Sequence, residues 1–575
     1  MTLRLAAVPL AGALVSLLAA AAEPAETPKP TAPPTKAEAP KPATPAEAPK
    51  PTAPPTKTEA PRPATPPPAA APTAEKLPIT GLSPSKILPD LCVLRYRVTT
   101  SSPECQAHFD QGLGWLYSYV WMEAARSFET ATKHDPDCAM AWWGLSRAME
   151  KWGKNKAKTD EAMKKAETLL LKANPAERML ITARLQQRGL VKVAVPSGKT
   201  EGDARRAAAA KTLDELLALY DDDEEAWYYR AELAGRAPSI PYYKALLRIN
   251  PLHPGANHEL VHFYEGHRRP ALGWIYAENY IRSSPGIPHA FHMQAHLATR
   301  LGRWDKTSDR SARAIELERA YHQTLNVNPA DDHQFLHHLD VLTQSLIHDG
   351  RFREARAIKE EALRHKIHLW GEWARLHIAE RDWDEALKAI EQIRRSDKTR
   401  ASYLSALLYF RKGDIGRAHA DVEVLQQAQL HKKGDRDLET RLWVAQGIYL
   451  CRTGAAEAGL QLLAKTVERT KDDYAHHSWG NGAYYMEIWG TEALFAGKAE
   501  VAEEAFLEAL AHDPASVRAA MGLQVLCERL GRSDEARRYA ELARRCWKRA
   551  EIQSFDAELA DLRRAEVTPK ISQGK

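Results

Sequence analysis

The chain has 575 residues, too many for one compact core, so we expect several domains or a stack of repeats. Its 80 basic and 75 acidic residues are intermixed and give a formal net charge of only +5. Because we find no concentrated basic stripe with interleaved aromatic residues, the sequence argues against nucleic-acid binding.

The first 22 residues have the features of a secretory signal peptide. A short basic start, Met1–Arg4, precedes an apolar run from Ala6 to Leu18 and small residues up to Ala22. The run is short for a membrane span, so we expect cleavage near Ala22 and no transmembrane anchor in the mature chain. An uncleaved N-terminal anchor is the alternative.

Residues 23–78 form a low-complexity segment rich in Pro, Ala, Lys and Thr. A nine-residue sequence that begins at Pro28 recurs at Pro49. The segment has few side chains to bury and many prolines without an amide donor, so we predict a disordered, polyproline-like linker. It serves either as a stalk or as a tolerated leader.

Residues 79–550 carry a repeated helical pattern. In the clearest unit, Cys105 to Cys138, small residues would let two antiparallel helices approach, aromatic residues would fill the gap and a proline would end the second helix. Near the other end, Gly497 and Gly531 are 34 residues apart, the period of a helix–turn–helix repeat. The key residues of the first unit are Gly112, Trp115, Ala124, Phe128, Ala131 and Pro136.

This pattern resembles the tetratricopeptide repeat. The resemblance implies an all-α solenoid, a right-handed superhelix whose concave groove is lined by the first helix of each pair. We expect irregular structure over residues 174–203, a helix from Glu224 to near Pro251, and a loop over residues 320–332. Residues 551–575 are expected to form a C-terminal capping helix and tail.

Histidines concentrate in the middle of the array, where fifteen of the 22 lie between residues 253 and 377. The pairs His258/His262 and His292/His296 are each spaced i, i+4, which puts both members on one helix face. The two pairs are 34 residues apart, so they occupy equivalent positions in successive repeats.

Three successive repeats are counted from residues 254, 288 and 336. The first has histidines at positions 5 and 9 of its first helix, the second at positions 2, 5 and 9, and the third has His337, Asp340 and Gln344 at those three positions. These positions span a narrow arc, and the resemblance implies that they face the groove. They supply the candidate metal ligands His258, His262, His289, His292, His296, His337 and Asp340.

Neutral imidazoles and a carboxylate are suitable ligands for Zn, Cu, Ni or Fe, so one hypothesis is a mono- or dinuclear metal site. The alternative is that these histidines bind one another, backbone carbonyls, nearby acids or a peptide.

The string from His258 to His262 also matches HExxH, the zinc helix of metalloproteases. In a metalloenzyme Glu259 or Glu265 would be the catalytic base. The extended motif fails, because Glu265 and Arg268 stand where Gly and His are needed, so we expect a coincidental match. His253 is expected to belong to the turn before the helix.

The blocks HPGxxHxxxH, from His253, and HMxxH, from His292, resemble a group of bacterial exported tetratricopeptide-repeat proteins. That group usually carries HNxH where this chain has residues 337–340, His-His-Leu-Asp. The resemblance implies a periplasmic, envelope-associated or extracellular protein and supplies no activity.

The six cysteines are scattered and form no CxxC pair. In an exported protein, Cys92 and Cys105 could form a disulfide; buried free thiols are the alternative.

The function that we expect from the sequence is an exported scaffold that binds a protein or peptide in its groove. No complete catalytic constellation is visible, which favours a binding protein over an enzyme without deciding between them. The alternative is a metal-binding protein, or a metal-dependent hydrolase or oxidase, that uses the histidines of residues 253–340 with Zn, Cu, Fe or Ni.

Overall fold

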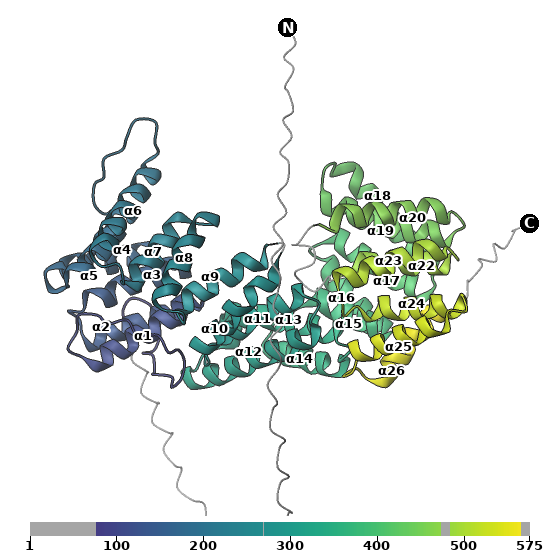
Figure 1. Cartoon of the computed structure of the whole chain (residues 1–575), viewed down its shortest axis with the longest axis horizontal. Coiled ribbons are helices and arrows are strands. Elements are labelled where there is room, and N and C mark those ends of the chain that lie inside the picture. Colours follow the sequence, from purple (N-terminus) through teal and green to yellow (C-terminus); the bar gives the residue numbers. More distant parts are fainter. Residues whose placement is uncertain (1–75, 268, 473–482, 565–575) are drawn as a thin grey trace, which may run out of the picture. The chain divides into compact units, whose positions relative to one another are not determined.

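The structure, a computed structural model, describes residues 76–267, 269–472 and 483–564, all in one unit of the chain. These residues form 25 α-helices and four short 3-10 helices and contain no β-strand (Figure 1). The expected all-α solenoid is confirmed. The predicted signal peptide, and the predicted linker as far as residue 75, lie outside the described residues.

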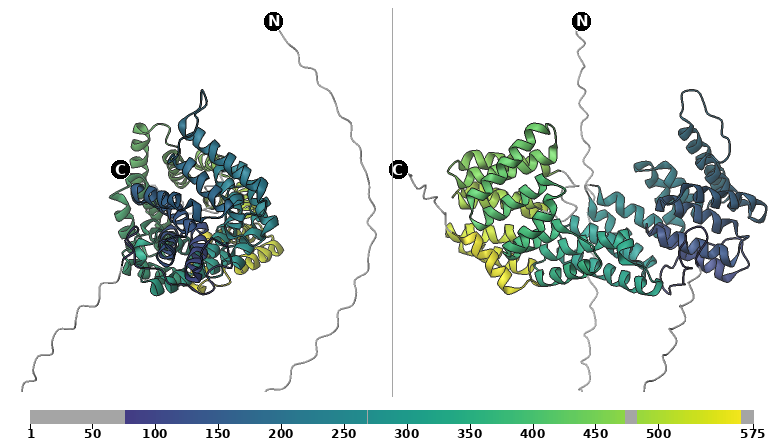
Figure 2. Two further views of the ribbon diagram at one scale, coloured as in Figure 1. Left: turned by 90° about the vertical axis from the view of Figure 1, so that its left-hand side faces the viewer. Right: turned by 180° about the vertical axis from the view of Figure 1, so that it is seen from behind.

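Each helix packs mainly on its neighbours in the chain, and the views from different sides agree on this arrangement (Figure 2). The N-terminal helices are α1 (Pro103–Tyr117), α2 (Trp121–His134), α3 (Ala139–Trp152), α4 (Lys156–Thr168), α5 (Pro175–Arg188), α6 (Glu201–Leu219), α7 (Glu224–Ala234) and α8 (Ile240–Ile249). The histidine-bearing repeats follow as α9 (Pro254–Glu265), α10 (Trp274–Ser283), α11 (Pro288–Arg300), α12 (Trp304–Leu325) and α13 (His333–His348).

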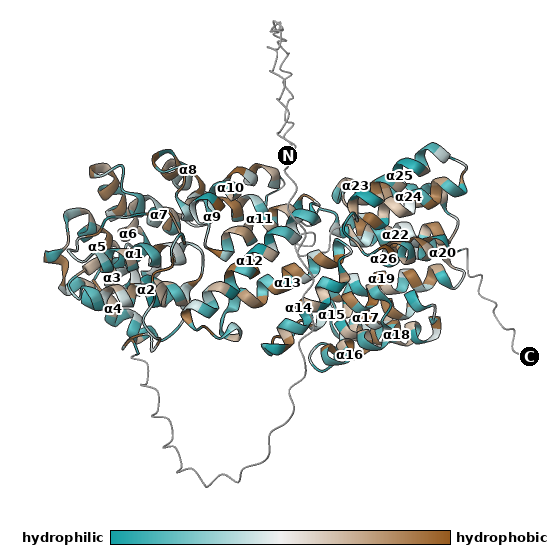
Figure 3. Cartoon of the chain, turned by 90° about the horizontal axis from the view of Figure 1, so that it is seen from below, coloured by the Kyte–Doolittle hydropathy of each residue, from teal (hydrophilic) through white to brown (hydrophobic). Residues whose placement is uncertain are grey.

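The C-terminal helices continue the same succession. They are α14 (Phe352–Arg364), α15 (Trp370–Glu380), α16 (Trp383–Arg394), α17 (Lys398–Lys412), α18 (Ile415–His431), α19 (Arg436–Arg452), α20 (Ala456–Thr470), α22 (Tyr484–Phe495), α23 (Ala499–His512), α24 (Val517–Arg529), α25 (Ser533–Cys546) and α26 (Ile552–Arg563). Hydrophobic and hydrophilic residues alternate along these helices, as amphipathic packing requires (Figure 3).

A buried phenylalanine clamped by two glycines sets the close approach of the first helices. Phe128 of α2 is fully buried between Gly112 of α1 and Gly144 of α3. A Cβ atom added at Gly112 would lie 2.7 Å from the Phe128 ring, and one at Gly144 would lie 2.5 Å from it. Only glycine leaves room for the ring at these distances, so the helix spacing follows directly from the repeat pattern.

The C-terminal repeats use the same clamp. Phe506 of α23 is fully buried, and Cβ atoms at Gly490 and Gly522 would approach its ring to 2.7 and 2.3 Å. The expected repeat frame therefore holds near both ends of the described chain.

Three expectations about individual segments need correction. Residues 174–203 are not irregular throughout, because Asn174 and Glu177 form a capping box that starts α5. The helix expected from Glu224 is interrupted at Gly235, whose φ is +64°. The loop expected from residue 320 begins only after α12 ends at Leu325. In each case a local cap or glycine decided the boundary.

Residues 76–102 precede the first helix as an irregular segment that packs along α1 and α2. The segment forms no helix or strand, and side chains of α1 and α2 accept hydrogen bonds from its backbone amides. The Thr80 amide donates to Glu129 Oε2 at 2.8 Å, and the Leu88 amide donates to Gln111 Oε1 at 2.8 Å. The folded part of the chain therefore begins before its first repeat.

The cysteines remain free thiols, so the structure does not form a disulfide between Cys92 and Cys105. Cys92 lies beside Ser284, whereas Cys105 contacts Cys138. Among the described helices, none is long and apolar enough to cross a membrane.

Candidate metal centre

Histidines from α9, α11 and α13 converge in the interior of the protein. They form three groups in which one ring nitrogen of each member lies within 4.8 Å of the others. Neighbouring groups share a residue, so the imidazoles form a continuous row. The groups are His258/His262/His289, His289/His292/His338 and His292/His296/His337.

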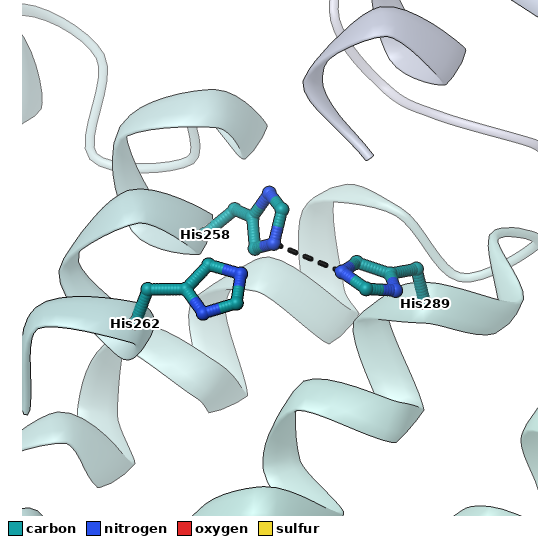
Figure 4. Close-up of side chains that lie close together, drawn as sticks. All are labelled: His258, His262 and His289. Carbon is teal, nitrogen blue, oxygen red and sulfur yellow. Dashed lines mark hydrogen bonds between the residues drawn. The ribbon is translucent and has the colours of Figure 1, made fainter. Parts of the chain in front are cut away.

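The first group shows how closely the side chains approach. His258 and His262 project from one face of α9 toward His289 of α11 (Figure 4). His258 Nε2 lies 3.0 Å from His289 Nε2. Two nitrogens bound tetrahedrally to one ion at about 2.05 Å would be separated by roughly 3.3 Å, so this pair needs only a small adjustment to bind one ion together.

Six of the seven candidate ligands belong to these groups, and Asp340 does not. Its carboxylate accepts a hydrogen bond from Gln344 Nε2 at 3.0 Å. Burial and the neighbouring charge of Glu372 raise the pKa of Asp340 to about 7. Asp340 is thus oriented toward α15 and away from the histidines.

His338 takes part instead, although the repeat numbering did not select it. It is fully buried, and its ring centroid lies 4.0 Å from that of His292. Aligning the repeats by their glycines placed the start of this unit at residue 336, whereas α13 begins at His333. The adjacent pair His337-His338 was the only sequence signal for its role.

A backbone carbonyl determines which nitrogen of His258 is available. His258 Nδ1 lies 2.5 Å from the carbonyl oxygen of Tyr117. The carbonyl can only accept, so Nδ1 donates and, in the neutral ring, Nε2 carries the lone pair that faces His289. A histidine held in this way is already oriented for metal binding.

Two buried carboxylates support other members of the row. Glu265 Oε1 lies 2.9 Å from His296 Nδ1, and Glu265 Oε2 lies 3.4 Å from His262 Nδ1. Burial opposes ionisation of Glu265, yet these two histidines hold its pKa well below the usual range. Glu265 therefore occupies the supporting position that carboxylates take behind metal-binding histidines.

Glu318 of α12 has the corresponding position behind His338, with Oε1 2.8 Å from Nδ1. Both side chains are almost completely buried. Burial raises the pKa of Glu318 and lowers the pKa of His338 to about 3, so both groups favour their uncharged forms.

The remaining histidines of the row are also held neutral. Burial, followed by repulsion from neighbouring histidines, lowers the pKa values of His258, His289 and His292 well below the usual value. The pKa of His337 falls to about 3 for the same reasons. Neutral imidazoles retain the lone pairs that a metal ion needs.

His292 is the most informative member. It is 0 % exposed, and neither of its ring nitrogens has a hydrogen-bond partner among the described residues. Leaving a buried polar group unsatisfied costs about 1–3 kcal/mol per group, so such a group requires an explanation. His292 belongs to two of the three groups, which places the unsatisfied nitrogens at the middle of the row.

Tyr119 covers the first group from the turn between α1 and α2. Its ring centroid lies 4.5 Å from that of His258 and 5.6 Å from that of His262. The backbone φ of Tyr119 is +60°, in the left-handed region that residues with a side chain rarely adopt. The Tyr119 hydroxyl donates to Glu259 Oε1 at 2.8 Å.

The HExxH glutamate is therefore engaged elsewhere. Glu259 accepts from Tyr119 and, at 3.4 Å, from Tyr228, and it belongs to none of the three groups. This arrangement gives no geometric support to a zinc-protease reading. His253 caps α9, as expected, since its Nδ1 accepts from the Ala256 amide at 3.1 Å.

Comparison with known proteins supports the repeat class. The tetratricopeptide-repeat family model matches residues 121–155, 372–429 and 489–551. These three segments thus match tetratricopeptide repeats, an architecture of protein-interaction scaffolds. No curated protein matches the chain.

Among solved structures, yeast Tom70 is 12 % identical, with a TM-score of 0.27, and covers 80 % of this chain and 92 % of its own. A dimer of human IFIT1 with m7Gppp-AAAA is 14 % identical, with a TM-score of 0.25, and covers 78 % of this chain and 90 % of its own.

Proposed function

We propose that this protein binds transition-metal ions in the row of histidines that α9, α11 and α13 contribute to its tetratricopeptide-repeat scaffold. This row, the three groups described above, is called the polyhistidine centre. The observation that carries the proposal is His292, which is fully buried, neutral and without a hydrogen-bond partner for either nitrogen in the described structure, at the point where two ligand groups meet. An ion in either group would use a lone pair that is otherwise desolvated without compensation.

The donor set defines the class of ion. Every member of the three groups is a histidine, and no thiolate takes part. Imidazole nitrogen suits Zn, Cu, Ni and Fe, whereas Ca and Mg prefer oxygen ligands. The buried Glu265 carboxylate contacts His296 and His262 and would strengthen their basicity.

The arrangement accommodates two ions at once. The first group, His258/His262/His289, and the third, His292/His296/His337, have no residue in common. An ion in the middle group would instead compete for His289 and His292. We therefore propose occupancy of the two outer groups, with three histidines each and an open coordination position.

The test is elemental analysis of the purified protein, before and after incubation with Zn or Cu. His262 and His337 are the least buried members of the outer groups, so their replacement disturbs packing least. We expect two ions in the wild type, one in His262→Ala, one in His337→Ala and none in the double variant.

His431→Ala is the matched control, because His431 is exposed at the end of α18. It should leave the metal content unchanged. A wild-type protein that is isolated without metal and takes up neither ion overturns the proposal. If the wild type binds one ion and only one of the single variants loses it, the metal centre stands but the proposed double occupancy is wrong.

We also propose, as the role of the scaffold, that an exported protein binds a peptide or protein partner in the groove of its repeats. The N-terminal signal-like sequence supports export. Sequencing the N-terminus of protein recovered from the cell envelope should find a start near residue 23; a start at Met1 in the cytosol would contradict export. Partner binding is supported by the C-terminal repeats, where Arg381, Arg411 and Arg518 converge on one carboxylate.

A further inference from the structure

The last helix, α26, places a buried carboxylate against three arginines from three other helices or turns. Glu558 lies 3.2 Å from Arg381 Nη2 and also pairs with Arg411 of α17 and Arg518 of α24. The Glu558 side chain is 9 % exposed, and the arginines are 20 to 23 % exposed. Burial opposes ionisation of Glu558, but the arginines outweigh it and hold its pKa at about 2.

Asp561, one turn further along α26, shares two of these partners. Its Oδ2 lies 2.6 Å from Arg381 Nη2 and 3.3 Å from Arg411 Nη2. At the start of the helix, the Glu551 carboxylate accepts from the backbone amides of Phe352 and Arg353, at 3.3 and 3.2 Å. Hydrogen bonds and ion pairs of these carboxylates thus join α26 to α14, α17 and α24.

The apolar face of α26 has the spacing of a helix that docks on other helices. Phe555, Leu559 and Leu562 lie four and three residues apart, and Leu562 is fully buried. Glu558 and Asp561 are on the same side of the helix, so one face presents both apolar contacts and carboxylates. Ile552, at the other end, is 72 % exposed, so α26 is only partly embedded.

Space remains beside this helix. A cavity of about 660 Å³ is bounded by Glu558 and Asp561 and by apolar side chains of α17 and α19, among them Leu404, Leu407 and Ile448. A cavity of this size, mainly apolar with a few converging charged groups, has the character of a ligand site. The groove of the C-terminal repeats is therefore larger than its resident helix.

We propose that this arginine-lined groove is a binding site for an acidic amphipathic helix of a partner protein, and that α26 is its internal occupant. The partner helix would carry two carboxylates three residues apart, flanked by large apolar residues, as α26 does. Three arginines recognise carboxylates through charge-assisted hydrogen bonds that another acidic helix can reproduce. The inference rests on the repeat scaffold and is independent of the metal centre.

Competition by α26 determines the expected affinities. A tethered helix has a high effective concentration, on the order of millimolar for a short linker, so it masks the site against a free helix. Removing its two carboxylates weakens the resident helix while it leaves the arginines intact. The masked site should then become available.

The experiment measures fluorescence anisotropy of a labelled peptide that spans residues 551–564. We expect the full-length E558Q/D561N protein to bind this peptide at least tenfold more tightly than the wild type does. The same peptide with both neutral substitutions should not bind, and R411Q added to the double variant should abolish binding. Full-length D556N is the matched control, because Asp556 is an exposed acid of the same helix, and it should behave as the wild type.

A second measurement uses the unaltered protein. Excess unlabelled peptide should increase hydrogen exchange in α26 of the wild type and leave α11 unchanged. A folded double variant that binds no better than the wild type, or no change in α26 exchange, overturns the proposal. A wild-type dimer that exchanges α26 between chains would assign the groove to a second copy and also overturn it.

Discussion

The two candidate binding regions of this protein solve the problem of buried polarity in opposite ways. Around His292 the polyhistidine centre buries neutral imidazoles, because burial lowers their pKa values, and it leaves both nitrogens of His292 without hydrogen-bond partners in the described structure. The C-terminal groove buries charged groups and pairs them, with Glu558 facing three arginines. The first region leaves His292 without a hydrogen-bond partner among the described residues, and the second pairs its charges through α26.

This difference indicates what each region can accept. Unsatisfied neutral imidazoles require a Lewis acid or a hydrogen-bonding ligand, and they gain stability when it binds. Paired charges gain little from an added ligand and instead exchange one carboxylate for another. We therefore expect metal addition to stabilise the histidine repeats and an acidic helix to substitute for α26. The two regions should therefore differ in their response to pH and to salt.

The largest expected effect is acid sensitivity of the histidine repeats, illustrated by His253, which caps α9 and is not a proposed ligand. Burial lowers its pKa from 6.5 to about 3. Its contribution to stability is complete above pH 6.5 and is lost as pH falls toward 3, because the unfolded chain binds the proton more readily. The loss should reach about 3 kcal/mol at pH 4.

His253→Asn is the informative variant, because asparagine can cap the helix but does not titrate in this range. Urea unfolding at pH 7 and pH 4 should show that the variant loses about 3 kcal/mol less than the wild type over this interval. Equal losses in both proteins would mean that His253 is protonated without cost.

The C-terminal groove should respond in a lower pH window and by a smaller amount. The arginines hold the pKa of Glu558 at about 2, against a usual 4.5, so its contribution is present above pH 4.5 and is lost as pH falls toward 2. By pH 3 the loss should be about 2 kcal/mol, and none is expected between pH 8 and pH 5.5. E558Q should remove this dependence.

Hydrogen exchange resolved by segment provides the measurement, since the two regions can be followed in one protein. Between pH 6.5 and pH 4, intrinsic-rate-corrected protection should fall in α9 before it falls in α26. Simultaneous loss would show that the regions unfold as one cooperative unit, and the proposed pH separation would be wrong.

Much of the architecture could be predicted because it depends on local spacing. The glycine–phenylalanine clamp at Phe128 follows from residues sixteen positions apart, and His258 and His262 share a face because a helix repeats every 3.6 residues. The equivalence of the two histidine repeats follows from their 34-residue step. None of these inferences needs knowledge of distant contacts.

The remainder depends on how distant helices meet. His338 joins the centre and Asp340 does not, and this depends on how α13 packs against α11, which the repeat numbering does not contain. Tyr119 reaches the first group from a turn some 140 residues away in the chain. The acidic face of α26 is visible in the sequence, but the arginines that meet it come from separate repeats.

The smallest expected effect is a difference in salt sensitivity. Raising ionic strength from 0.1 to 1 M shortens the screening length from about 10 to about 3 Å. The arginines around Glu558 are 20 to 23 % exposed, so salt reaches these pairs in part. Protection of α26 amides should fall by less than about 1 kcal/mol. Protection of α11 should not change, because His289 and His292 are neutral and the contact between His296 and Glu265 is buried away from salt. Sodium chloride and potassium chloride should give the same result, because screening depends on ionic strength and not on the cation. A loss in α11 as large as that in α26 would show that charge also stabilises the histidine centre, and the contrast between the two regions would then fail.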